Sequence, residues 1–186
     1  MKVVIVPHDP EWAEAFASEA RRIRMALGAV VVEVHHIGST AIPGMPAKPI
    51  IDMLLEVRSL DDLDGATAAL EAAGYEAMGE FGIPGRRYFR KDSAAGVRTH
   101  QIHAFEQGSV GCERHLAFRD YMIDHPDAAR AYGLLKRQLV EAHAGDLEAY
   151  IDGKDAFVKE HEAMAIGWKK GATPRDSASC EPDHEA

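Results

Sequence analysis

Two short apolar segments, residues 29–37 and 50–57, flank a loop that contains a Gly-Ser turn and three prolines. Each segment is rich in aliphatic residues and too short for an independent helix, so each is predicted to form a buried strand. The prolines exclude a regular helix between them, because each proline lacks a backbone donor and restricts the residue before it. The chain is therefore expected to build a sheet in which a rigid loop joins two strands.

The other elements are predicted from the spacing of apolar residues and from turn signals. Apolar side chains recur at helical spacing after Asp9-Pro10 and predict a helix that ends at Gly28. Ser59 is a capping residue and predicts a second helix that ends near Gly74. A short β-branched run at residues 2–6 precedes the first helix; three further strands are expected at residues 75–81, 86–91 and 98–105, and further helices at about 113–124, after Pro126, and at about 154–169.

Composition limits the class of protein. The 186 residues are 46% apolar, which suffices for one core, so we predict one domain over residues 1–170 and a flexible tail over residues 171–186. The formal charge of −9 argues against a nucleic-acid partner, because phosphate neutralisation needs clustered Lys and Arg. No stretch approaches the length of a membrane span, and two distant cysteines give no disulfide framework. A cytoplasmic protein with a small-molecule partner and no membrane partner is expected, and its oligomeric state stays open.

The Gly38-Ser39 turn and Asp52 are the first candidates for chemistry. A glycine lets the backbone approach a ligand closely, and the following serine offers a hydroxyl and an amide to a phosphate oxygen. Asp52 lies inside the second apolar segment, where an ionised carboxylate is costly without donors, a cation or a solvent-filled cleft. Two interpretations of Asp52 remain open: an ion pair with a neighbour such as Lys48, and a ligand of Mg²⁺.

A longer motif surrounds these residues. The stretch from His36 to Asp52 reads HIGSTAIPGMPAKPIID and resembles the signature of the GrpB family, predicted members of the nucleotidyltransferase superfamily. Residues 98–103, 115–121 and 132–136 are also similar to that family, so the resemblance covers nearly everything before the tail. It implies an α+β or α/β fold, with a mixed sheet of about five strands, helices packed on it, and C-terminal helices after it.

The resemblance also implies a substrate, a cofactor and a set of site residues. The substrate would be a nucleoside triphosphate, with Mg²⁺ or Mn²⁺ as cofactor, and Gly38, Ser39 and Thr40 would bind phosphate. In the superfamily, two acids on one strand hold the metal and a third comes from a neighbouring strand. Asp52 matches the first acid, but Leu54 occupies the second position. Glu56 cannot replace it, because four residues along a strand span roughly 13 Å.

Histidines occupy the strand that should carry the third acid. Neutral imidazole binds transition metals and can act as a general base, so Asp52, His100 and His103 are the candidate catalytic residues. Asp52 with His103 is the candidate metal pair. Residues three apart on a strand face opposite sides, so the two histidines would not both reach one metal without a bulge. The alternative is that one or both histidines are hydrogen-bonded structural residues.

Basic residues supply candidate phosphate ligands. Alternation along the strand at residues 86–91 places Arg86, Tyr88 and Arg90 on one side, where they could meet phosphates or a carboxylate. Arg87 of the same cluster, Lys48 and Lys136 are the basic residues assigned to cofactor binding. The alternative is an exposed hairpin and ordinary surface ion pairs with the abundant Asp and Glu.

Three functions remain open at this point. The first is transfer of a nucleotidyl group from a nucleoside triphosphate to a small acceptor. The second is a non-catalytic accessory module that binds a nucleotide or a ligand resembling coenzyme A, favoured by the missing second acid. The third is a metal-dependent hydrolase built from Asp52 and a histidine.

Overall fold

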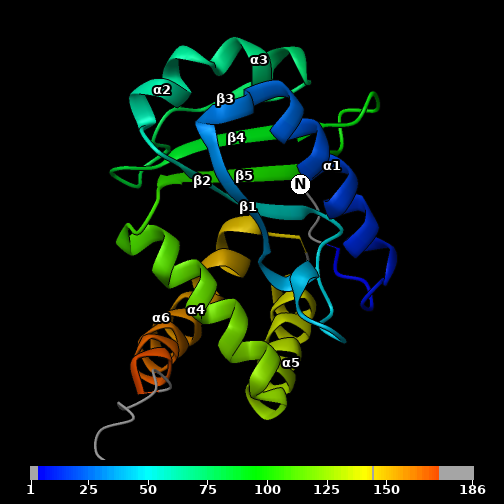
Figure 1. Cartoon of the computed structure of the whole chain (residues 1–186). Helices are drawn as coiled ribbons and strands as arrows, with labels where there is room; N and C mark the ends of the chain where they lie inside the picture. The colour runs from blue at the N-terminus through cyan, green and yellow to red at the C-terminus, as the bar shows by residue number, and fades with distance from the viewer. Residues whose placement is uncertain (1–3, 144, 172–186) are drawn as a thin grey trace, which may run out of the picture.

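The computed structural model describes residues 4–143 and 145–171 (Figure 1). The elements in chain order are α1 (Glu11–Leu27), β1 (Val31–Ile37), β2 (Ile51–Val57), α2 (Leu60–Gly65), α3 (Thr67–Ala72), β3 (Glu76–Ala77), β4 (Arg87–Asp92), β5 (Arg98–Glu106), α4 (Val110–Asp124), α5 (Pro126–His143) and α6 (Leu147–Gly171). Short 3-10 turns follow α1 and β1, at Gly28–Val30 and Ser39–Ala41.

The described strands form one mixed sheet in the order β1-β2-β5-β4-β3. β2 pairs in parallel with β5, and the other neighbouring pairs are antiparallel. The register sets Asp52 beside Gln101 and Leu54 beside His103. The predicted mixed sheet of about five strands, with packed helices and C-terminal helices, is confirmed.

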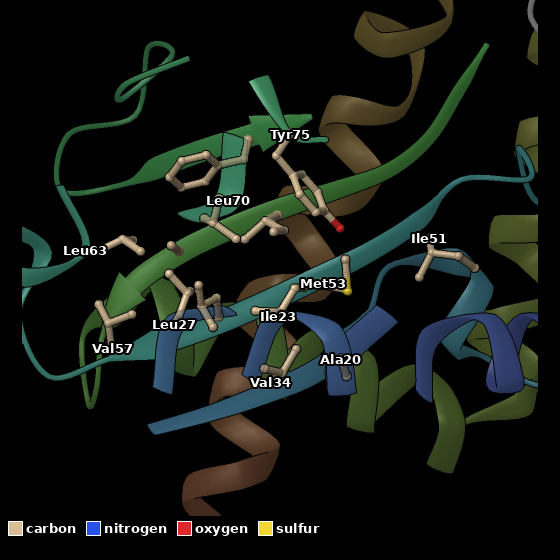
Figure 2. Close-up of a cluster of buried hydrophobic side chains, with 14 of the residues drawn as sticks. Ala20, Ile23, Leu27, Val34, Ile51, Met53, Val57, Leu63, Leu70 and Tyr75 are labelled. Atoms are coloured by element: carbon tan, nitrogen blue, oxygen red, sulfur yellow. The ribbon is translucent and has the colours of Figure 1, made fainter. Parts of the chain in front are cut away.

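Helices lie on both faces of the sheet (Figure 1). α1, α2 and α3 pack on one face, where Ile23, Leu70, Met53 and Ile102 are fully buried (Figure 2). Because side chains alternate along a strand, Asp52 and Leu54 point away from Met53 and toward the opposite face. That second face meets α4, whose Cys112 packs with Leu54. Asp52 therefore lies outside the main core because consecutive residues of β2 face opposite sides of the sheet.

Three predicted elements have different bounds in the structure. The helix expected from Ser59 to Gly74 is two helices that meet at Ala66, because Gly65 weakens a helix interior. The strand expected at residues 75–81 is limited to β3, since Gly79, Phe81 and Gly82 adopt positive φ. The last helix begins at Leu147 instead of residue 154.

The two ends of the chain add little to the sheet. Before α1, Val6 forms a single antiparallel bridge with Ala47. Of the predicted tail, Gly171 is the end of α6, and the remainder lies outside the described residues. Within the described ranges, no helix is long and apolar enough to cross a membrane.

Candidate functional site

A pocket of about 740 Å³ lies between the second face of the sheet and the C-terminal helices. The Gly38-Ser39 turn and Asp52 form one wall, and β4, β5, α5 and α6 supply the others. The cationic side chains that line it are Lys48, Arg86, Arg90, Arg98, Lys136 and Lys154. The carboxylates that line it are Asp52 and Glu162, and Glu162 is already paired with Arg114 at 3.3 Å. Cationic side chains therefore surround this pocket, although the whole chain has a net negative charge.

The turn is shaped around Asp52. Gly38 has φ of +69°, and a Cβ on it would lie 2.7 Å from Oδ2 of Asp52. Glycine is thus required both by the backbone conformation and by the closeness of the carboxylate. Thr40 is buried; its hydroxyl donates to the carbonyl of Ile50 at 3.5 Å and lies 2.9 Å from Nε2 of His36. These contacts hold the loop that carries Ser39.

Lys136 reaches this turn from α5. Its Nζ donates to Oγ of Ser39 at 2.9 Å and to the carbonyl of Pro46 at 2.5 Å, and it lies 4.7 Å from the centre of the Tyr132 ring. The side chain is only 2% exposed, and it forms no ion pair with any described residue. Burial, with a smaller contribution from the charge of Lys154, lowers the pKa of Lys136 to about 7. A buried ammonium group without a counterion favours an anionic ligand.

Two further lysines of the pocket, Lys48 and Lys154, also have lowered pKa values. Burial, and then the charge of Lys48, lower the pKa of Lys154 to about 8, although Asp52 opposes the shift. Burial also lowers the pKa of Lys48, again against the attraction of Asp52. Both lysines lie over the ring of Tyr150, at 5.8 Å for Lys48 and 4.5 Å for Lys154. Asp52 is therefore a negative charge shared by two incompletely solvated lysines, Lys48 and Lys154.

Asp52 and His103 come together as expected. Nε2 of His103 lies 3.9 Å from Oδ1 of Asp52. On the other side of the imidazole, Nη1 of Arg86 lies 3.3 Å from Nδ1. Arg86 is 6% exposed, and its remaining polar contacts are the backbone carbonyls of Glu80 and Phe81.

The structure brings most of the predicted site residues to the pocket. Those that line it are Gly38, Ser39, Thr40, Lys48, Asp52, His103 and Lys136. His100 and Arg87 are not brought there, because strand alternation turns both toward the face that α1 and α2 cover. His100 pairs in register with Ile51 of the core, and Arg87 makes a bidentate ion pair with Asp64 of α2 at 2.7 Å.

The donor set for two metal ions is incomplete. Leu54, at the position of the second acid, is fully buried against Ile37 and Phe105. Glu56 faces His35, with 3.4 Å between Oε1 and Nε2. Among the described residues, no group of three His, Cys, Asp or Glu side chains could hold a metal ion. The single carboxylate of Asp52 fits one Mg²⁺ or Mn²⁺ that arrives already bound to phosphates, since Mg²⁺ needs only one or two protein carboxylates in such sites.

Several pocket residues were not identified from the sequence. α6 supplies Tyr150, Lys154 and Glu162. Asp146 caps the first turn of this helix, and that turn lies before the predicted start of the helix. Tyr150 and Lys154 are four residues apart on that helix, so a helix predicted one turn longer would have placed them on one face. Arg86 and Arg90 follow the predicted alternation.

The sheet order, the Gly-Ser turn and the strand aspartate define a nucleotidyltransferase-like fold. The structure of Cid1 in complex with its short product ApU matches 80% of this chain and 48% of that chain, with a TM-score of 0.52 and 12% identity, which bears on the fold alone. Within this fold class, the chain belongs to the GrpB family, whose family pattern "GrpB protein" matches residues 2–164. The predicted family membership is confirmed.

Two relatives show how far the similarity extends. The crystal structure of the conserved protein GrpB from Enterococcus faecalis matches 90% of this chain and 99% of that chain, with a TM-score of 0.85 and 40% identity. The UPF0157 protein YqkA of Bacillus subtilis is 47% identical over 170 residues, which are 91% of this chain and 49% of the relative. The chain thus spans about half of the length of that relative.

Proposed function

We propose that the pocket binds a nucleoside triphosphate or another phosphorylated small molecule. The observation that carries this proposal is Lys136, a buried ammonium group without a carboxylate partner that donates to Ser39 of the Gly-Ser turn. Phosphate oxygens would receive the donors of this lysine and of the turn, and they would supply the missing negative charge. Lys48 and Lys154 extend the cationic surface along the same wall.

The remaining surface suits the rest of such a ligand. The volume of about 740 Å³ falls within the roughly 300–1,000 Å³ typical of small-molecule sites. Aromatic and aliphatic side chains alternate with the cations on the walls, among them Tyr88, Phe118, Tyr132 and Ile151. These groups would pack against the flat or apolar part of a nucleotide.

A divalent cation would enter with the phosphates. Asp52 would hold Mg²⁺ or Mn²⁺, which supplies positive charge to the phosphate oxygens when bound. Nucleotidyl transfer to a small acceptor is a second candidate function, and the observation that favours it is the close fit of Gly38 around the Asp52 carboxylate. A non-catalytic module that binds phosphate without a metal would not need an aspartate at that position, because a carboxylate repels phosphate.

Thermal unfolding with ATP, GTP, CTP and UTP, each with and without Mg²⁺ or Mn²⁺, tests the proposal. A nucleotide at 100 times its Kd stabilises the native state by about 2.7 kcal/mol, which raises the melting temperature measurably. The Lys136→Met variant should lose most of this stabilisation. Lys159→Met is the matched control, because Lys159 is an exposed lysine on α6 paired with Asp155.

The Asp52→Asn variant separates the two candidate functions. Stabilisation that depends on the metal and disappears in Asp52→Asn supports an enzyme, and formation of a nucleotidylated acceptor would be sought next. Stabilisation without metal that survives in Asp52→Asn supports a binding module. The proposal is rejected if no nucleotide and no pyrophosphate stabilises the wild-type protein.

A further inference from the structure

Arg86 contacts one of the two ring nitrogens of His103. Its Nη1 lies 3.3 Å from Nδ1 of His103, and an arginine guanidinium has only donors. Nδ1 must therefore accept this hydrogen bond with its lone pair. A neutral imidazole has one N–H and one lone pair, so the proton of His103 is left on Nε2.

Arg86 is held firmly in this arrangement. Its Nε donates to the carbonyl of Glu80 at 3.2 Å and its Nη2 donates to the carbonyl of Phe81 at 2.7 Å. The ring of Tyr88 lies 5.0 Å from the guanidinium carbon. With only 6% of the residue exposed, Arg86 has little freedom to turn away from His103.

Nε2 of His103 lies 3.9 Å from Oδ1 of Asp52, and both residues line the pocket. We propose that Arg86 is a positioning residue that fixes His103 as the Nε2–H tautomer, so that His103 presents a hydrogen-bond donor to the pocket. This inference concerns the ligand-free protein and does not depend on nucleotide binding.

The tautomer argues against the expected metal pair of Asp52 and His103. A histidine that ligates a metal through one nitrogen almost always donates the N–H of its other nitrogen to a carboxylate, a carbonyl or water. At His103 that second position faces the donor of Arg86 instead. A lone pair on Nε2 would require a proton on Nδ1. The N–H group at Nδ1 would then point at an N–H group of Arg86, and two donors cannot form a hydrogen bond. The 3.9 Å separation alone would have allowed a shared metal.

The same geometry specifies the ligand atom that fits here. An atom bound against Nε2 of His103 must be a hydrogen-bond acceptor, and the charge of Arg86 is not matched by any carboxylate among the described residues. His115 adds no positive charge, because burial above all lowers its pKa to about 3. This end of the pocket therefore suits an anionic oxygen, from a phosphate or a carboxylate.

Nitrogen NMR of protein labelled with ¹⁵N-histidine measures the tautomer directly. The spectrum is recorded well above the ordinary histidine pKa of about 6.5, so that neutral rings dominate. The resonances of His103 are those that disappear in the His103→Gln variant. We expect a protonated Nε2 and an unprotonated Nδ1. A protonated Nδ1, or rapid exchange between both forms, overturns the proposal.

Substitutions of Arg86 test the cause. Arg86→Lys keeps a donor and should keep the Nε2–H tautomer, whereas Arg86→Glu places an acceptor at Nδ1 and should move the proton there. Arg86→Glu should also bind Zn²⁺ about 10–100-fold more tightly than wild type, the usual effect of a second-shell partner, and His103→Gln should abolish the gain. An unchanged tautomer in folded Arg86→Glu contradicts the assigned role of Arg86. If Arg86→Glu does not fold, Arg86→Met, which removes the donor, should leave both tautomers of His103 populated, and an unchanged, single Nε2–H form in that variant contradicts the role of Arg86.

Discussion

The ammonium group of Lys136 donates to the hydroxyl of Ser39 at 2.9 Å, across a separation of 97 residues in the chain. The contact joins α5 to the turn that follows β1, and it closes the cationic side of the pocket over the Gly-Ser motif. Since burial brings the pKa of Lys136 to about 7, the charge of this group changes near neutral pH.

The affinity of the pocket for phosphorylated ligands should fall as pH rises. Lys136 and Lys154, with pKa values of about 7 and about 8, lose their protons in this range, and each loss removes a positive charge from the wall. A bound anion favours the protonated lysines, so binding is tightest below both values. Calorimetric titration with ATP at a series of pH values measures the trend.

Lys136→Met supplies the control for this prediction. The variant should lose the step near pH 7 and keep the one near pH 8, while the titration of the ligand itself affects both proteins equally. An affinity that is flat or increases with pH in the wild-type protein would contradict the assigned role of the lysines.

Gly38→Ala should cost more stability than Gly44→Ala. Both glycines have positive φ, so either alanine carries backbone strain of about 1–2 kcal/mol. Only at Gly38 does the new Cβ meet another group, Oδ2 of Asp52 at 2.7 Å, which adds overpacking of about 1–3 kcal/mol. Urea denaturation measures the difference. Nucleotide affinity should fall in Gly38→Ala alone, and equal effects of the two variants would count against the fit of the turn around Asp52.

Leu54→Asp, which restores the acid pattern of the superfamily, should destabilise the protein without completing a metal site. Leu54 is fully buried with Ile37, Phe105 and Cys112, so the change removes apolar contacts worth about 2–5 kcal/mol and buries a carboxylate. Leu54→Met keeps the volume and should cost less than about 1.5 kcal/mol. Full stability of Leu54→Asp, measured by urea denaturation, would show that the position is more open than its packing indicates.

Glu19→Gln should reduce stability and leave the pocket unchanged. Glu19 is 4% exposed on the opposite face of the sheet, where it accepts from Lys91 at 2.6 Å and from Tyr75 at 3.0 Å. Removing one partner of a buried pair costs about 3–5 kcal/mol, because the other charge remains unpaired. Glu14→Gln is the control, since Glu14 pairs with Arg21 on the exposed surface.

The stability that Glu19 contributes depends on pH with a definite sign. Burial raises the pKa of this carboxyl, but the hydrogen bond and charge of Lys91, with His100 and Tyr75, lower it overall below 4.5. The contribution is therefore complete above the unfolded-state pKa of about 4.5 and is lost as pH falls through the lower folded-state pKa. The difference in free energy of unfolding between wild type and Glu19→Gln should therefore be constant above pH about 4.5 and should shrink as the pH falls below that value, which urea denaturation at a series of pH values measures. Equal pH profiles would remove Glu19 from this account.

Local pattern predicted much of the sheet and one wall of the site. Short apolar segments and turn residues located β1, β2 and the Gly38-Ser39 turn, because strand length and proline placement are properties of neighbouring residues. Alternation also placed Arg86, Tyr88 and Arg90 on the pocket side. The resemblance to the GrpB family added the prediction that the sheet is mixed.

Features that depend on distant contacts were predicted only in part: Asp52 was paired with His103, but His100 and Arg87 were also assigned to the site. Whether His100 or His103 faces Asp52 depends on the parallel register of β5 against β2, and no local signal specifies that register. The position of the Arg87 side chain also depends on a distant contact, because its partner Asp64 lies on α2. Tyr150 was missed because α6 begins earlier than the apolar pattern that identified it, whereas Lys154 and Glu162 lie inside the predicted helix and carry no local signal of a pocket.

The residues that line the pocket extend along the chain from Ile37 to Glu162. During synthesis from the N-terminus, the turn and Asp52 emerge long before α5 and α6 can close over them, and until then β2 also lacks its parallel neighbour β5. The nascent chain therefore offers a ligand no complete pocket until α5 and α6 have been synthesised. The concentration of the ligand can protect the finished protein from unfolding, but it cannot guide the early half of the chain toward the fold.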